Sequence, residues 1–273
     1  MTALAAPEAG ALRTRAWHRT VMGMPVSIHL RAPDLPAGAE RSVAAVYAEL
    51  RRLDGMFSTY RPDSAVSLLA DGVLTPEQCP PEVSEVLDLC ELARELTAGA
   101  IDARRPLPDG GSRVDPTGLV KGWAVERAAA PLHDLPGTDF YVNAGGDLLC
   151  HVADEGRPAW RVGIEDPQRP DRLRAVITMR DGGVATSGAA RRGHHIWDPR
   201  AGGAADGPAS VTVSGPTLLW ADVLATATYV SGAGSARWAA TAGYQVDVVA
   251  HDGGLLRTCP VLGPTDGRTP PGL

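Results

Sequence analysis

Residues 115–126 read DPTGLVKGWAVE, and this stretch decides how the rest of the chain is interpreted. Asp115 and Pro116 mark the start of a helix, because a carboxylate caps free backbone amides and proline favours the first helical position. Apolar residues then recur at helical spacing and give the helix one buried face; they are Leu119, Val120, Trp123, Ala124, Ala128 and Leu132.

Two glycines interrupt the first turns of this helix. Gly118 and Gly122 each cost about 1 kcal/mol relative to alanine. Glycines at such positions indicate that a second chain segment or a ligand approaches the backbone closely. Lys121 lies between them, near a helix N-terminus where anions are favoured. Two interpretations stay open from this segment alone: an amphipathic helix with a loosely packed first turn, and a phosphate-binding turn.

Composition indicates a soluble globular protein. The 273 residues are 44% hydrophobic and 21% charged, which suits one large domain or two small ones. The formal net charge of -6 disfavours a general nucleic-acid-binding surface, which needs a basic patch, so no nucleic-acid partner is expected. No segment approaches the roughly 18 uninterrupted apolar residues of a transmembrane helix, so no membrane span is expected.

The cysteines and the two ends of the chain bear on the cellular compartment and on the limits of the domain. The first residues lack a basic start followed by an apolar core, so we do not interpret them as a signal peptide. We predict that residues 1–16 are disordered, that 17–262 form one domain and that 263–273 form a flexible tail. The cysteines are far apart and include no Cys-x-x-Cys pair, which favours a reducing cytoplasm; they are Cys79, Cys90, Cys150 and Cys259.

Periodicity places helices in the first half of the chain and strands in the second. Amphipathic helices are predicted at about 37–57, 81–98 and 218–230, and residues 103–113 are predicted to form a loop. Strands are predicted at about 17–31, 139–143, 147–153, 159–164, 172–180, 183–187 and 209–215. A tight glycine turn at 143–147 joins two of them.

Asp222 and Thr226 form a candidate metal site in the last long helix. A spacing of four residues puts both oxygen-bearing side chains on one helix face. Mg²⁺ prefers hard oxygen ligands and usually shares them with a substrate phosphate. The alternative is that Thr226 bonds back to the carbonyl of Asp222 and that neither residue binds a metal.

The segment from Thr186 to Arg200 carries the candidate proton-transfer group. Thr186-Ser187-Gly188 is interpreted as an ordinary turn at a strand end. His194 and His195 follow it, and neighbouring residues in a strand point to opposite faces, so the two do not form a metal pair. One of the two is the candidate acid or base.

Taken in order, the motifs resemble the ApbE-like FAD:protein FMN transferases. The resemblance spans roughly residues 17–232 and includes departures: Ala70 stands where the family usually has Asn, and Glu126 where Asp is common. Many members also carry a signal peptide and a lipid-anchored cysteine. The motifs are Met22-Gly23, residues 58–64, Gly99 to Asp102, Val114-Asp115 to Lys121-Gly122, Asn143 to Asp147, Trp160 with Asp166-Pro167, Thr186 to Gly188, His194 to Pro199, and Ala221-Asp222 to Thr226-Ala227.

The resemblance implies a fold and a set of site residues. The fold is α+β, with a mixed, largely antiparallel sheet, packed helices and two intimate lobes that form an FAD cleft. His195 and Asp222 are the catalytic candidates, and His195 is favoured as the base because a metal-bound carboxylate is a poor one. The Gly118 carbonyl, Asp222, the Ala225 carbonyl and Thr226 would bind Mg²⁺. The residues that would surround FAD are Met22, Tyr60, Ala100, Ile101, Asp102, Asp115, Lys121 and Ile196.

The resemblance also implies a reaction. Such an enzyme transfers FMN from FAD to a Thr or Ser hydroxyl of an acceptor protein, releases AMP and requires Mg²⁺. Two alternatives stay open: an FAD pyrophosphatase that releases FMN and AMP, and a flavin-binding protein that has lost catalysis. The sequence does not separate transferase from hydrolase, because the difference is whether an acceptor protein docks.

Overall fold

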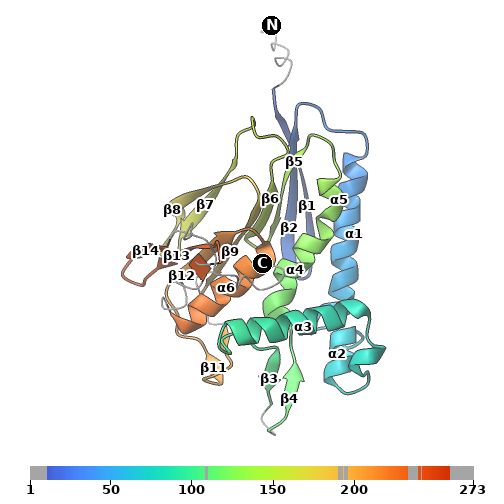
Figure 1. Ribbon diagram of the computed structural model, residues 1–273, viewed down its shortest axis with the longest axis vertical. Helices are drawn as coiled ribbons and strands as arrows, with labels where there is room; N and C mark the ends of the chain where they lie inside the picture. The colour runs from blue at the N-terminus through green and yellow to red at the C-terminus, as the bar shows by residue number, and fades with distance from the viewer. Residues whose placement is uncertain are drawn as a thin grey trace.

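The computed structural model describes residues 11–107, 110–189, 193, 196–232, 239–240 and 242–258. Its centre is an eight-stranded sheet with the strand order β1-β2-β5-β6-β9-β12-β13-β14, and every pairing in it is antiparallel (Figure 1). The strands are β1 (Arg13–Val21), β2 (Met24–Ala32), β5 (Asp139–Ala144), β6 (Asp147–His151), β9 (Gly182–Gly188), β12 (Ser210–Gly215), β13 (Gln245–Val249) and β14 (Leu255–Thr258).

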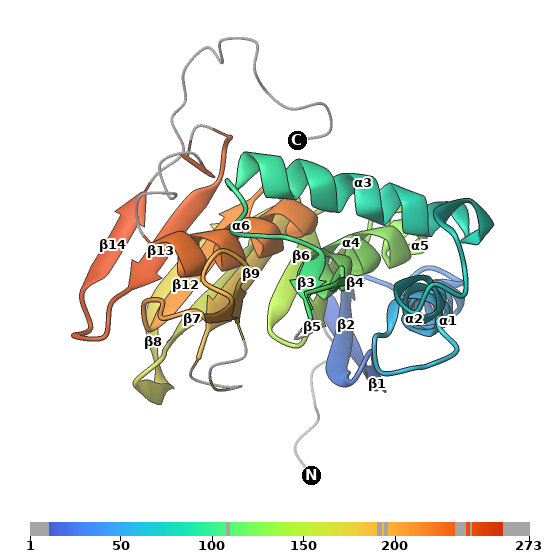
Figure 2. The ribbon, with the colours of Figure 1, turned by 90° about the horizontal axis from the view of Figure 1, so that it is seen from below.

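The helices gather on one side of this sheet, as Figure 2 shows. The helices that can be delimited in the described residues are α1 (Ala39–Phe57), α2 (Ala65–Ala70), α3 (Pro81–Leu96), α4 (Thr117–Ala128), α5 (Ala130–His133) and α6 (Leu218–Ser231), and a 3-10 turn η1 (Pro76–Gln78) lies between α2 and α3. None of the helices in the described ranges is long and apolar enough to span a bilayer.

Beside the main sheet, the described residues contain three two-stranded antiparallel pairs. They are β3 (Arg104–Pro106) with β4 (Ser112–Val114), β7 (Trp160–Asp166) with β8 (Arg169–Met179), and β10 (Trp197–Asp198) with β11 (Gly203–Ala204). The β7–β8 pair buries Ile164 and Ile177 against Val184 of β9. The neighbouring Ala185 belongs to the main core with the helices, so β9 is covered on both faces.

Alternation along the strands builds the main core. Val26, Ile28 and Leu30 of β2 are buried, and Phe140 and Val142 of β5 are fully buried in the same cluster. Apolar residues at every second position of a strand point to one face, here the face that the helices cover. Burial of this continuous surface is the main force that holds the helices on the sheet.

Helices α4 and α6 meet at a glycine. A Cβ atom on Gly122 would lie 2.8 Å from the Leu219 Cα and 2.9 Å from the Leu218 carbonyl oxygen, so only glycine fits there. One turn further along α4, Glu126 Oε1 accepts a hydrogen bond from the Leu218 backbone N–H at 2.5 Å. A carboxylate on the first free amides of a helix caps it and complements its dipole. Glu126 therefore caps α6 from α4.

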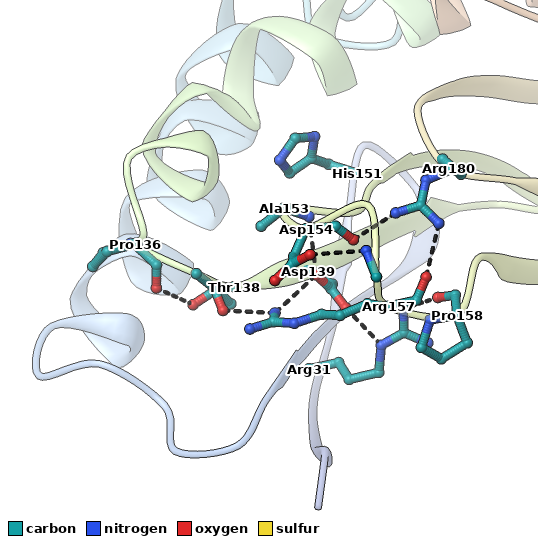
Figure 3. A network of polar contacts seen from close by, with 12 residues as sticks. Arg31, Pro136, Thr138, Asp139, His151, Ala153, Asp154, Arg157, Pro158 and Arg180 are labelled. Carbon is teal, nitrogen blue, oxygen red and sulfur yellow. Dashed lines mark hydrogen bonds and ion pairs between the residues drawn. The ribbon is translucent and has the colours of Figure 1, made fainter. Parts of the chain in front are cut away.

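A second polar network lies at the start of β5 (Figure 3). Asp139 is fully buried and pairs with Arg31 Nε at 2.9 Å and with Arg157 NH1 at 3.0 Å. It also accepts the Ala153 backbone N–H at 3.0 Å. Arg180 donates to the carbonyls of Asp154 and Arg157. Because two guanidinium groups neutralise one buried carboxylate, this network pins the loop between β6 and β7.

The predicted α+β class with a largely antiparallel sheet is confirmed, while the two-lobe arrangement stays a prediction. Strand β1 begins at Arg13, so residues 13–16, predicted as disordered, are in the sheet. Residues 104–106 and 112–114 of the predicted loop form the exposed strand β3 and the partly buried strand β4, whose sequences carry no apolar alternation. Helix α4 begins at Thr117, with Pro116 in the capping position. The predicted tail at 263–273 lies outside the described residues.

The two glycines of α4 make a matched test of the packing. Gly122→Ala is expected to lower the free energy of unfolding by about 1–3 kcal/mol, because the added methyl group must separate α4 from α6. Gly118→Ala is the control: its Cβ would meet nothing within 4 Å, and alanine is the better helix former by about 1 kcal/mol. Chemical denaturation of both variants measures the difference. Equal stability of the two would contradict the close contact.

Candidate functional site

Several strand ends and turns meet at one end of the sheet. Gly145 N donates to the Pro25 carbonyl at 3.0 Å, so the turn after β5 lies beside the Met22-Gly23 turn that joins β1 and β2. Asp147 opens β6 and accepts the Thr186 backbone N–H of β9 at 3.0 Å. These contacts put the glycine turn, Asp147 and the C-terminal half of β9 at the same end of the sheet.

Lys121 lies between two buried carboxylates at this end. Its Nζ is 3.1 Å from Asp222 Oδ1 of α6 and also forms an ion pair with Asp147 Oδ2. Asp147 is 3% exposed and Asp222 is 5% exposed, whereas the Lys121 side chain is 25% exposed. Three elements far apart in the sequence therefore each contribute one charge: α4, the start of β6 and α6.

The balance of charge in this cluster is negative, since two carboxylates face one ammonium. Burial and the neighbouring Asp147 carboxylate together raise the pKa of Asp222 to about 6, although Lys121 and the Gly122 backbone N–H oppose this rise. Burial lowers the pKa of Lys121, but the two carboxylates more than offset it, so the net shift is upward. Lys121 is therefore charged at neutral pH, while Asp222 carries a proton more readily than an ordinary carboxyl group.

Helix α6 places the predicted metal ligands. Asp222 and Thr226 lie one turn apart, and Thr226 Oγ1 is 2.9 Å from Ser187 Oγ of β9. Ala225, whose carbonyl was predicted to be a ligand, is fully buried. Gly118 is exposed, and apart from its chain neighbours and the nearby backbone of α4, no described atom lies within 4 Å of a Cβ built on it. Approach by a chain segment thus accounts for Gly122, and approach by a ligand stays the prediction for Gly118.

The donor set fits a hard divalent cation. The groups predicted as ligands are carboxylate, hydroxyl and carbonyl oxygens, which Mg²⁺ prefers. A cation would also favour the charged form of Asp222, whose pKa is raised by burial and by the nearby Asp147 carboxylate. In the described ranges no three His, Cys, Asp or Glu residues are grouped as a complete metal site. The set therefore suits Mg²⁺, which completes its shell with water and substrate phosphate.

A second group of predicted residues surrounds the β3–β4 pair. Ala100, Ile101 and Ile196 are buried. Asp102 pairs with Arg104 Nε at 3.3 Å, and Asp115 pairs with Arg105 NH1 at 3.0 Å. A cavity of about 170 Å³ opens beside Asp102 and Arg104.

Asp115 also orders the start of α4, since its Oδ1 accepts the Thr117 N–H at 3.2 Å. The Arg105 guanidinium lies 5.3 Å from the centroid of the Trp197 ring. The hairpin β3–β4 therefore connects the end of α3, the start of α4 and β10.

Three predicted site residues remain: Met22 and Tyr60, predicted to surround FAD, and His195, predicted to be the base. Met22 is partly buried and has φ of 54°, an unfavourable value for a side chain without special turn preference. Tyr60 is 94% exposed at the tip of the α1–α2 loop, which Ser64 closes by donating to the Ser58 carbonyl. His195 lies outside the described residues.

Sequence analysis predicted no role at the site for three residues. Asp147 belonged to the glycine-turn motif, Ser187 was interpreted as part of a turn, and Glu126 was noted only as a departure from the family pattern. Their partners are Lys121, Thr226 and Leu218, all distant in sequence. One signal in the sequence was available: Lys121 is the only lysine among the 26 lysine and arginine residues.

Comparison with known proteins gives the family. A model of the ApbE family matches residues 22–105 and 103–250. The FAD:protein FMN transferase of Haemophilus influenzae is 25% identical over 259 residues, covering 72% of this chain and 75% of that protein. The enzyme of the same name from Vibrio cholerae is 32% identical over 129 residues, covering 44% of this chain and 39% of that protein.

Solved structures give the same fold. The ApbE protein of Thermotoga maritima superposes with a TM-score of 0.78 at 22% identity, covering 90% of this chain and 97% of that chain. The flavin transferase ApbE from Vibrio cholerae gives a TM-score of 0.75 at 22% identity, covering 92% and 98%.

The electrostatics of Asp222 predict an unusual effect on stability. Its folded-state pKa lies above the ordinary 3.8, so its ionisation destabilises the fold at pH above about 6, and the effect vanishes below 3.8. Asp222→Asn should therefore raise the free energy of unfolding at pH 8 in chelator, by on the order of 3 kcal/mol. Below pH 4 the two proteins should have equal stability.

Asp139→Asn is the control for this measurement. It removes a buried carboxylate that two guanidinium groups neutralise, so it should destabilise the protein at pH 8. Thermal or urea unfolding across pH 4–8 measures both effects. Destabilisation by Asp222→Asn at pH 8 would show that Lys121 fully compensates Asp222.

Proposed function

Because this chain belongs to the ApbE family, we propose that it transfers FMN from FAD to a Thr or Ser hydroxyl of an acceptor protein and releases AMP. The observation that carries the proposal is the placement of Lys121 against Asp222, one helical turn from Thr226. An ammonium and a set of hard oxygen ligands at one point are the groups that a pyrophosphate and its metal ion need.

In this proposal the start of α4 receives the pyrophosphate. Lys121 contributes a positive charge, and a helix N-terminus adds the dipole of its free amides. The exposed Gly118 leaves the backbone open to the ligand. The other residues proposed to surround FAD are Met22, Tyr60, Ala100, Ile101, Asp102, Asp115 and Ile196.

Tyr60 and the β3–β4 ion pairs suggest how FAD would be held. The ring of Tyr60 is exposed and can stack on a flavin or adenine ring, which would bury it. Asp102 and Asp115 lie in contact with Arg104 and Arg105, so hydrogen bonds to FAD would replace or share these ion pairs.

Asp222, Thr226 and the carbonyl groups of Gly118 and Ala225 would hold Mg²⁺. When bound, Mg²⁺ neutralises the charge that develops on the pyrophosphate as its bridging bond breaks. The acceptor hydroxyl oxygen forms the new bond to the FMN phosphorus, and the bond between that phosphorus and the AMP oxygen breaks. His195 is proposed to take the hydroxyl proton, with Asp222 as the alternative.

The acceptor is proposed to be a protein that presents a Thr or Ser in a loop. The net charge of -6 gives no support for a nucleic acid in that role. The cytoplasm is the proposed location, supported by the unpaired thiols of Cys79, Cys90 and Cys150.

Mass spectrometry tests the reaction directly. The purified protein is incubated with FAD, Mg²⁺ and lysate of the native host, and we expect an acceptor peptide to gain FMN on Thr or Ser while AMP accumulates. Asp222→Ala or excess chelator should abolish the transfer, because the metal ion loses its buried carboxylate. Full activity in either case would contradict the metal assignment.

The same assay separates the alternatives. Release of FMN and AMP without any modified protein would replace the transferase by an FAD pyrophosphatase. If neither product forms with Mg²⁺ present, a flavin-binding protein without catalysis remains.

Ligand binding tests the role of Lys121. Lys121→Ala should weaken FAD binding by roughly 1.5–3 kcal/mol, because a charge-assisted contact to the pyrophosphate is lost. Riboflavin has no phosphate, so its affinity should change far less. Isothermal titration with both ligands makes the comparison, and equal losses would place Lys121 away from the phosphates.

A further inference from the structure

Asp147 has two carboxylate oxygens with different tasks. Oδ1 accepts the Thr186 backbone N–H at 3.0 Å and ties the start of β6 to β9. Oδ2 is buried, accepts no hydrogen bond with regular geometry and lies in ion-pair contact with Lys121 Nζ. One oxygen therefore joins two strands of the sheet, and the other contacts the ammonium group of Lys121.

Lys121 needs a second carboxylate if Asp222 engages a metal ion. In this structure Lys121 is shared between Asp147 and Asp222. Mg²⁺ on Asp222 would repel the ammonium and withdraw one of its two partners. Asp147 is 3% exposed and fixed by Thr186, so it can hold the ammonium in place without help from Asp222.

The choice of lysine supports a compact charge at this point. The other basic residues of the chain are all arginines, yet position 121 is lysine. An ammonium group is a compact charge with three donors, whereas a guanidinium is a planar fork that prefers one bidentate partner. Lysine can thus contact Asp147, Asp222 and a phosphate oxygen from one nitrogen atom.

We infer that Asp147 is a positioning residue that keeps the Lys121 ammonium at the pyrophosphate of FAD while Asp222 binds the metal ion. The inference rests on the proposed function. It assigns Asp147 no contact with the reacting atoms, and its effect on the reaction passes through Lys121 alone.

Asp147→Asn separates the two tasks of this side chain. Asparagine keeps an oxygen for the Thr186 N–H and loses the charge that faces Lys121. We expect kcat/KM for FMN transfer to fall about 10- to 100-fold and FAD affinity to fall more than riboflavin affinity. In a Lys121→Ala background the same substitution should change kcat/KM less than about threefold, because the partner is gone.

Asp247→Asn is the matched control. Asp247 of β13 is also a buried carboxylate in a strand, and it pairs with Arg257 of β14 at 2.5 Å. Its loss removes a comparable ion pair outside the site and should leave the KM for FAD unchanged. Additive effects of Asp147→Asn and Lys121→Ala, or equal effects of Asp147→Asn and Asp247→Asn, would overturn the inference.

A measurement on the unaltered protein covers the case in which Asp147→Asn does not fold. Because the chain has one lysine, [15N]lysine labelling gives a single side-chain ammonium resonance in NMR spectra. That resonance should remain observable when Mg²⁺ saturates the protein, since Asp147 still shields it from exchange. Its loss on Mg²⁺ addition would overturn the inference. This measurement and FAD affinity need no turnover, so they distinguish failure of the positioning role from failure of the transferase proposal.

Discussion

The contact between α4 and α6 at Gly122 is the constraint on which the site depends. Only a residue without a side chain allows the Leu218–Leu219 backbone to approach α4 so closely, and Glu126 then caps α6 from the same helix. With the two axes fixed in this way, Lys121 and Asp222 lie within 3.1 Å of each other. The helical cost of glycine, about 1 kcal/mol, is small beside the packing that it permits.

The sequence predicted the parts of the site that depend on local spacing. Asp222 and Thr226 are one turn apart, and the glycines of α4 indicated a close approach, which Gly122 makes. It did not reveal Asp147 or Ser187 as partners, because their contacts join segments far apart in the chain. The strand ladder sets these contacts, and periodicity does not report which strands are neighbours. The β3–β4 pair was missed for another reason: its exposed arginines lack the apolar alternation that marks a strand.

Two groups of buried charge in this protein illustrate how a structural network differs from a site. Around Asp139, two guanidinium groups face one carboxylate, and the Arg180 guanidinium donates hydrogen bonds to two backbone carbonyls. Around Lys121, two carboxylates face one ammonium, and burial of Asp222, together with the nearby Asp147 carboxylate, raises the pKa of Asp222. In the first cluster the buried carboxylate has two cationic partners, so its charge is compensated and the network stabilises the fold. An uncompensated cluster costs stability, and such a cost is typical of a position that binds a ligand of opposite charge.

The net negative charge of the Lys121 cluster bears on which ligand the site would bind first. Lys121, Asp147 and Asp222 together carry one net negative charge, which repels a free pyrophosphate and attracts a divalent cation. With the cation bound, the cluster carries one net positive charge and attracts the pyrophosphate. Under the proposed function, the metal ion and the nucleotide would therefore favour each other's binding through charge alone, with no change of conformation required. The proposed site would therefore discriminate between FAD accompanied by its metal ion and FAD without it, although the flavin ring is the same in both.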